Sequence, residues 1–398
     1  MDTHRPPVDF LYILHSDLTL WRFKLPLIRR LLQDGHRVTV SCPPGPFTPQ
    51  FASAGIQHVP WRLIRENKNP WFEIQTVLHI RRIIRELSPG LIHTFTARPN
   101  LYGSWANRLA WKNIPLVNSV MGLGTLYIDC QDGSLSLKHR VMNGMYKWAF
   151  AQSRKVIFLN QDDCAWFLQH RIVQSCQARL IRGEGVDLDF FHPVDSRKQA
   201  DLRRELPLPA NAIVILMVAR LIREKGVLEF CRAAQVLKEK YNNKVHFVVV
   251  GDIDQGNPSC LSWDDLYGFR NTWIVQFTGH LDEPQPYFAA SDIYCLPSYR
   301  EGLPVTVQEA MASGLPVVTT ESPGCRETID EGVSGFLVPV RNVEALVDRL
   351  DRLIQDPALR ERLGRAGREK AVREFSVEKI VDQHIAIYEE ILYQDIIS

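Results

Sequence analysis

Two glutamates with seven residues between them, Glu301 and Glu309, lie where the sequence predicts a loop followed by a helix. Apolar segments at residues 292–297 and 317–320 flank them and are predicted to be neighbouring buried strands. Parallel strands joined by a helix bind ligands at their carboxyl ends. A helix starting near Pro304, a residue suited to a first helical turn, would direct free amides toward the same place. These are the amides of Gly302, Leu303 and Val305. The stretch is predicted to bind an anion; alternatively, Glu301 is a solvated loop charge and Glu309 an ordinary surface residue.

A second cluster of chemically useful residues follows the apolar run at residues 212–219, which has the length of a buried strand. Arg220 and Lys225 stand where the chain leaves this strand, and a helix is predicted directly after them. Arginine binds phosphate oxygens as a fork and lysine as a point charge, so this pair suits a diphosphate. The alternative is a solvated basic turn.

The two clusters together resemble the retaining glycosyltransferases of family 4. The resemblance extends over the C-terminal half through an ordered series of loops: residues 277–280 with Gly279, the Glu301 and Glu309 pair, residues 314–318, residues 322–324 with Glu327, and residues 332–339. It implies an α/β protein of the GT-B fold, in which two Rossmann-like doubly wound domains face each other across a cleft. It also implies that a C-terminal helix crosses back to the N-terminal domain.

The N-terminal half alternates strand and helix signals, as expected of a parallel sheet. Residues 15–19, 23–28, 93–100 and 119–124 resemble the bacterial branch that adds hexosamines to polyprenyl-diphosphate-linked sugars. Two positions depart from the family: Ser16-Asp17 replaces a frequent Gly-Gly pair, and Met121 stands where many members have a histidine that touches the donor sugar. We expect domain 1 to span residues 1–190 together with helix 376–398, and domain 2 to span residues 191–375.

The resemblance implies three groups of site residues. Catalytic roles fall to Arg220, Lys225 and Glu301; donor binding to Gly279, Gly302, Leu303, Pro304, Val305 and Glu309; acceptor binding to Asp17, Thr19, His93 and Arg98. For His93 a structural role at a strand end is the alternative. The cations and amides would stabilise the departing phosphate in place of a metal, so we expect no metal and no cofactor beyond the nucleotide-sugar co-substrate. The resemblance implies UDP as its nucleotide, with GDP as the alternative.

Composition and charge narrow the partners. A chain of 398 residues suits two domains, and its eight cysteines show no C-x-x-C pair. Residues 1–185 contain 23 Lys and Arg against 12 Asp and Glu, a net of +11, and the basic residues alternate with apolar ones around Trp21, Trp61 and Trp71. An anionic membrane surface and a polyprenyl-diphosphate-linked glycan fit this pattern, although core helices with solvated arginines would also produce it. Nucleic-acid-binding motifs are lacking, so we expect no nucleic-acid partner.

The sequence also bears on the localisation of the protein and on alternative functions. The sequence has no long apolar run and its first residues do not resemble a signal peptide, so we expect a cytoplasmic protein that is peripheral on the inner face of the membrane. The rivals are a sugar-nucleotide epimerase of the same architecture, a non-catalytic scaffold of a glycan assembly complex, and a dinucleotide-dependent oxidoreductase. The last is disfavoured because no G-x-G-x-x-G follows a strand.

Overall fold

The computed structural model describes residues 6–62, 69–128 and 136–393. The chain forms two compact units, Met1–Glu184 with Glu378–Ser398, and Gly185–Val377. The boundary between the two units therefore lies between Glu184 and Gly185, a few residues before the boundary expected at residue 190. Residues 63–65 of the basic and apolar run around Trp61, and the end of the expected final helix beyond residue 393, lie outside the described residues.

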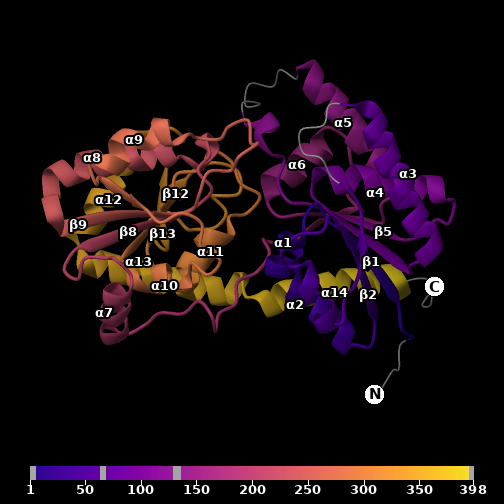
Figure 1. The fold of residues 1–398 in the computed structure, drawn as a ribbon, viewed down its shortest axis with the longest axis horizontal. Helices are drawn as coiled ribbons and strands as arrows, with labels where there is room; N and C mark the ends of the chain where they lie inside the picture. The colour runs from indigo at the N-terminus through magenta and orange to yellow at the C-terminus, as the bar shows by residue number, and fades with distance from the viewer. Residues whose placement is uncertain (1–5, 63–68, 129–135, 394–398) are drawn as a thin grey trace. The chain divides into compact units, whose positions relative to one another are not determined.

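The first unit is built on a seven-stranded parallel sheet with the order β3-β2-β1-β4-β5-β6-β7 (Figure 1). Its strands are β1 (Asp9–Ile13), β2 (Arg37–Cys42), β3 (Gln57–Pro60), β4 (Leu91–Phe95), β5 (Leu116–Val120), β6 (Lys155–Phe158) and β7 (Ala178–Leu180). Its helices are α1 (Asp17–Thr19), α2 (Leu25–Gln33), α3 (Pro70–Leu87), α4 (Ala97–Ala110), α5 (Leu137–Phe150), α6 (Gln161–Gln169) and α14 (Val377–Tyr393). Helix α4 packs between α3 and α5. Strands β4 and β5 are buried along their whole length, as expected when helices cover both faces of a sheet.

The C-terminal helix α14 belongs to the first unit, which confirms the expectation that the last helix returns to the N-terminal domain. The Tyr388 hydroxyl lies 2.7 Å from that of Tyr12 on β1 and 2.6 Å from Nδ1 of His93 on β4. Near the end of the helix, Glu390 accepts from both Lys155 and Arg179, at 2.6 and 2.7 Å. These contacts tie α14 to four strands of the sheet, β1, β4, β6 and β7.

The second unit has a six-stranded parallel sheet with the order β10-β9-β8-β11-β12-β13. Its strands are β8 (Ile213–Val218), β9 (Val245–Val250), β10 (Val275–Phe277), β11 (Ile293–Leu296), β12 (Val317–Thr320) and β13 (Gly335–Val338). Its helices are α7 (Ser196–Glu205), α8 (Val227–Tyr241), α9 (Trp263–Asn271), α10 (Gln285–Ala290), α11 (Val305–Ala312), α12 (Val343–Gln355) and α13 (Pro357–Glu374). The order of the strands reverses between β8 and β11, which makes their carboxyl ends the topological switch point where ligands bind in such sheets.

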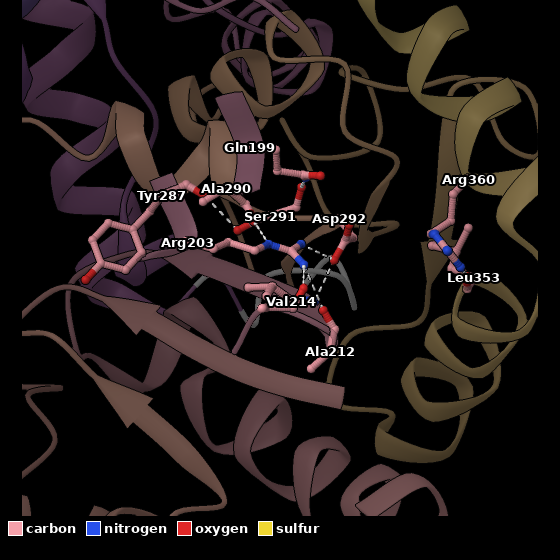
Figure 2. A network of polar contacts seen from close by, with 11 residues as sticks. Gln199, Arg203, Ala212, Val214, Tyr287, Ala290, Ser291, Asp292, Leu353 and Arg360 are labelled. Carbon is pink, nitrogen blue, oxygen red and sulfur yellow. Dashed lines mark hydrogen bonds and ion pairs between the residues drawn. The ribbon is translucent and has the colours of Figure 1, made fainter. Parts of the chain in front are cut away.

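A buried arginine anchors the opposite, amino edge of this sheet. Figure 2 shows Arg203 of α7 reaching the start of β8 and β11, where its guanidinium donates to the carbonyl oxygens of Ala290 and Ala212 at 2.8 and 3.0 Å. Its remaining arm pairs with Asp292 at 2.6 Å, and the same carboxylate oxygen accepts from the Val214 amide at 2.7 Å. Every contact of this network holds backbone or a neighbouring charge, so we interpret it as structural.

Within the described part of the chain, no helix combines the length and the apolar character that crossing a bilayer requires.

Candidate functional site

The loops after β8 and β11 meet at the carboxyl edge of the second sheet, because these strands are parallel neighbours. A short 3-10 turn at Arg223–Lys225 follows β8 and presents Lys225. Its Nζ lies 2.5 Å from Oε1 of Glu301, and the two side chains are only 20% and 12% exposed. The structure thus pairs, at the switch point, two residues that are 76 positions apart in the sequence.

Two glycines allow the backbones around this ion pair to pack closely. Gly226 has φ +73°, and a Cβ there would lie 2.1 Å from the carbonyl oxygen of Pro297. Gly324, in the loop after β12, has φ +79°, and its Cβ would lie 2.4 Å from the carbonyl oxygen of Glu301. The Glu301 amide also donates to the Pro323 carbonyl at 3.0 Å. Side chains at either glycine would force the loops apart, so both positions fix the geometry of the pair.

Helix α11 begins directly after the Glu301 loop. Pro304 is its N-cap, with extended backbone angles, and Val305 is the first helical residue. The expectation of Pro304 in the first turn is therefore off by one position. Among the described residues, the amides of Leu303 and Val305 have no hydrogen-bond acceptor, whereas Gly302 has a further contact. Unpaired amides at a helix start, together with the helix dipole, favour an anion. Glu309 is half-buried one turn into the same helix.

Arg220 is held by a partner that sequence reasoning missed. Its Nη1 lies 2.6 Å from Oδ2 of Asp254, and Arg220 is 58% exposed while Asp254 is 14% exposed. Asp254 belongs to the loop after β9, which starts at Gly251, where φ is +153° and a Cβ would lie 1.9 Å from the Ala219 carbonyl oxygen. The signal in the sequence was a Gly-Asp-x-Asp segment directly after an apolar strand. Arg220 therefore lies at the same sheet edge as Lys225 but pairs with a different loop.

Gly279 lies at the same edge of the sheet, next to the end of β9 and on the side away from β8. It follows β10, has φ +80°, and its carbonyl accepts from the Gly251 amide at 2.9 Å. Nothing lies within 4 Å of the position that its Cβ would take, so open space adjoins its backbone. The donor residues expected in the second domain thus lie on loops or a helix start after β8, β10 and β11, all at one edge of one sheet.

In the first unit, Asp17 is 4% exposed and is committed to the chain's own backbone. Oδ1 accepts from the Leu18 amide at 2.8 Å, and Oδ2 accepts from the amides of Phe47 and Thr48 at 2.8 and 3.2 Å. A Cβ at Gly45 would lie 2.3 Å from Oδ1. We therefore revise the direct acceptor contact expected for Asp17: its carboxylate shapes the loop after β2.

His93 is fully buried, and the direct acceptor contact expected for it is replaced by a structural role. Nδ1 lies 2.6 Å from the Tyr388 hydroxyl and Nε2 lies 2.8 Å from the Ser119 hydroxyl, so both ring nitrogens are used. Burial lowers the pKa of the ring well below its ordinary value, and the charges of His384 and Lys24 lower it further. The neutral ring therefore cross-links β4, β5 and α14.

His15, which follows β1, contacts Thr19 and also the segment that precedes Arg98, and these two residues are the remaining acceptor candidates. Its Nε2 lies 3.4 Å from the Thr19 hydroxyl, and its Nδ1 lies 3.3 Å from the Thr96 hydroxyl. Thr96 has φ +72°, a conformation that L-residues rarely adopt, and it leads into α4, where Arg98 is half-buried in the first turn. Strained backbone of this kind clusters at functional sites. Thr19 and Arg98 thus both lie at the carboxyl edge of the first sheet.

Comparison with known proteins matches one family model to each half of the chain. The family model described as Glycosyltransferase Family 4 matches residues 25–190, and the model described as Glycosyl transferases group 1 matches residues 198–370. Among curated proteins, the chain is 28% identical over 384 residues to the N,N'-diacetylbacillosaminyl-diphospho-undecaprenol alpha-1,3-N-acetylgalactosaminyltransferase of Campylobacter jejuni subsp. jejuni serotype O:2, covering 96% of this chain and 98% of that protein. It is 26% identical over 325 residues to the UDP-Gal:alpha-D-GlcNAc-diphosphoundecaprenol alpha-1,3-galactosyltransferase of Escherichia coli, covering 79% of each.

Solved structures show the same fold at lower identity. A glycosyltransferase from Rickettsia africae ESF-5 superposes with a TM-score of 0.77 at 21% identity, over 98% of this chain and 99% of that one. An Anabaena protein solved in complex with UDP superposes with a TM-score of 0.76 at 20% identity, over 96% of this chain and 100% of that one. The two sheets, the paired residues at the switch point and both family matches lead to one conclusion: the chain belongs to the family 4 glycosyltransferases of the GT-B fold.

Proposed function

We propose that this enzyme transfers a hexose or N-acetylhexosamine, with retention of configuration, from a UDP-sugar to a polyprenyl-diphosphate-linked saccharide during bacterial glycan assembly. The observation that carries the donor half is the Lys225–Glu301 pair beside the unpaired amides of Leu303 and Val305. The acceptor class is supported by the printed names of the Campylobacter and Escherichia relatives, both of which act on undecaprenol-diphosphate-linked sugars. The Anabaena structure, which contains UDP, supports the nucleotide.

The proposed chemistry follows the charge that develops during transfer. The bond from the anomeric carbon to the UDP oxygen breaks, a bond from the same face to an acceptor hydroxyl oxygen forms, and the hydroxyl proton passes to the departing phosphate. Lys225, Arg220 and the α11 amides stabilise the negative charge on that phosphate. Glu301 orients the sugar hydroxyls and Glu309 holds the ribose, with Gly279 leaving room for the nucleotide.

The acceptor is proposed to enter over the carboxyl edge of the first sheet, where Thr19 and Arg98 lie. Attachment to an anionic membrane surface on the cytoplasmic side follows from a lipid-linked acceptor and a basic N-terminal half, and no nucleic-acid partner is part of the proposal. Because protein cations and amides serve the phosphate, we propose that transfer requires no added metal.

The direct test offers the purified protein UDP-GalNAc, UDP-GlcNAc and UDP-Gal with an undecaprenyl-diphosphate-linked N-acetylated monosaccharide, with and without EDTA. We expect UDP release and a disaccharide lipid with one donor, unchanged by EDTA. Conversion of a UDP-sugar to its epimer in reactions that lack acceptor would identify the epimerase instead. A folded protein that turns over none of the donors would support the scaffold, and loss of transfer with EDTA would contradict metal independence.

A further inference from the structure

A cavity of about 450 Å³ lies in the first unit, between the segments that follow β2 and β3 and the first half of α3. Small-molecule sites typically have volumes of roughly 300–1,000 Å³, so this cavity is large enough for a ligand. Pro44 and Trp61 contribute from the two strand ends, and Phe72, Gln75 and His79 contribute from the helix. Since both strands end here, the cavity opens at the carboxyl edge of the sheet, the edge where Thr19 and Arg98 also lie.

The walls of the cavity suit an apolar ligand. Trp61 lines the cavity from the hydrophobic core, where it is 2% exposed, and its indole N–H already donates to the Ser41 carbonyl at 3.1 Å, so it presents no free donor to a ligand. His79 is likewise engaged, with Nε2 lying 3.2 Å from the Pro60 carbonyl oxygen. The proline and phenylalanine side chains add further carbon surface.

The apolar surface continues outside the cavity along α3. Trp71, Ile74 and Leu78 are 66%, 47% and 47% exposed. Their spacing of three and four residues places them on one face of the helix, beside the face that lines the cavity. Exposed large apolar side chains that are grouped in this way mark sites for lipids or partners. A long apolar chain that leaves the cavity would therefore meet more apolar surface before it reached water.

Among the described lining residues, one cation, Arg62, lies without a counter-charge. Arg62 is exposed and has no ion-pair partner among the described residues, and none of the described lining residues is acidic. An apolar cavity with an arginine at its rim is complementary to a molecule that joins a hydrocarbon chain to an anionic head. Asp17 supports this arrangement indirectly, because it holds the backbone of residues 47 and 48, in the loop that supplies Pro44.

We propose that this cavity binds the prenyl segment nearest the diphosphate of a prenyl diphosphate, with Arg62 contacting the diphosphate. This deepens the proposed function, on which it rests for the identity of the lipid, by assigning the chain-binding part of the acceptor site. Helix α3 then does two tasks: its inner face grips the first prenyl units and its exposed stripe carries the chain toward the bilayer.

The test measures binding of farnesyl diphosphate, dimethylallyl diphosphate and inorganic pyrophosphate to the full-length protein by titration calorimetry, without any donor. Farnesyl diphosphate should bind at least tenfold more tightly than dimethylallyl diphosphate, and pyrophosphate should bind weakest. Gln75→Trp, which narrows the cavity, should remove the preference for the longer chain. Gln169→Trp, the same change at an exposed helical position away from the cavity, should keep it. Arg62→Gln should weaken both prenyl diphosphates by a similar factor, whereas Arg29→Gln on α2 should not.

Equal affinities for farnesyl diphosphate and pyrophosphate in the unaltered protein would overturn the proposal. So would a Gln75→Trp protein with the wild-type chain-length preference. If Gln75→Trp fails to melt cooperatively, His79→Trp replaces it with the same expectation. Because no sugar donor is used, a negative result leaves glycosyl transfer standing, and a protein that binds farnesyl diphosphate yet transfers no sugar would keep the pocket and contradict the proposed function.

Discussion

At the scale of single residues, Lys225 and Glu301 form a half-buried pair whose partners have different proposed tasks. In the proposed mechanism, replacing Lys225 with alanine removes a preorganised donor from the phosphate on which charge develops. Loss of one such donor commonly lowers turnover ~10²–10³-fold, and we expect a loss of that size. Arg223→Ala is the matched control, because Arg223 lies on the same turn, is 53% exposed and pairs only loosely with Asp265 at 3.4 Å. A folded Lys225→Ala enzyme with near-normal turnover would contradict the proposed role.

Glu301→Gln separates the two tasks of the pair. It keeps the shape of the side chain but removes the charge that lies 2.5 Å from the Lys225 ammonium. Since an unneutralised ammonium attracts phosphate more strongly, UDP should bind more tightly to the variant, whereas sugar transfer should fall at least tenfold because the sugar hydroxyls lose a charged acceptor. Calorimetry with UDP and initial transfer rates measure the two effects. If binding and transfer weakened together, Glu301 would act mainly on the nucleotide.

At the scale of elements, the first unit contains a buried ion pair between Lys24, at the end of a π-helical turn (Leu20–Lys24), and Glu184. The side chains are 2% and 4% exposed. Removing one partner of such a pair leaves an uncompensated buried charge and typically costs about 3–5 kcal/mol. We expect Glu184→Gln to lower the free energy of unfolding of this unit by about that amount, measured by urea denaturation.

The exposed pair of Arg82 and Glu86 supplies the comparison for that experiment. These side chains are 77% and 60% exposed, and exposed pairs contribute about 0–1 kcal/mol, so Arg82→Ala should change stability little. The double variant Lys24→Met with Glu184→Leu should recover much of the loss, because neither charge is then buried. If Glu184→Gln and Arg82→Ala lowered the free energy of unfolding equally, leaving the Lys24 charge buried without its partner would not carry the predicted cost.

Two buried histidines next to this pair predict a pH dependence of stability. Burial lowers the pKa of His384 from 6.5 to about 3, with help from the Lys24 charge, and burial lowers that of His93 as well. The unfolded chain takes up protons on both rings below its ordinary pKa, while the folded chain does not. The unfolded state therefore binds more protons, and stability falls as pH drops below 6.5, with a slope of up to about 1.4 kcal/mol per pH unit for each ring. His384→Gln should flatten this fall between pH 6.5 and 4.5, and His192→Gln, at an exposed position, should not.

Element positions were largely predictable from the sequence, whereas partners across the fold were not. Apolar runs located β8, β11 and β12, and periodicity with turn residues located α2 and the returning helix α14. The start of α11 was placed one residue early, because proline suits both a first turn and an N-cap position. The proximity of Lys225 and Glu301 was predictable, since adjacent parallel strands bring the loops that follow them together. No local sequence pattern shows the packing on which three other features depend. These are the Arg220–Asp254 pair, the burial of His93 and the hydrogen bonds that Asp17 accepts from backbone amides.

At the scale of the whole molecule, charge and exposed apolar residues are distributed unevenly along the chain. The net charge of +11 on residues 1–185 leaves −9 on residues 186–398, since the total is +2. Helices α3 and α5 begin after the carboxyl ends of β3 and β5, and they expose Trp71 and Leu137 by 66% and 77%. Both helices flank α4 in Figure 1. A membrane surface that met this edge would contact exposed apolar side chains of the half of the chain that has the excess of cations.

The last prediction concerns attachment to lipid. The protein should sediment with vesicles of anionic phospholipid at low salt and less so as salt rises, because exposed charges are screened beyond about 10 Å at 0.1 M ionic strength. Trp71→Ser with Leu137→Ser should reduce sedimentation several-fold even at low salt, since the apolar contribution to binding is lost. Trp273→Ser is the control, because Trp273 is 75% exposed in the second unit, which has an excess of acidic residues. Absence of sedimentation at every salt concentration, or an equal loss with Trp273→Ser, would show that the first unit does not hold the enzyme at the bilayer.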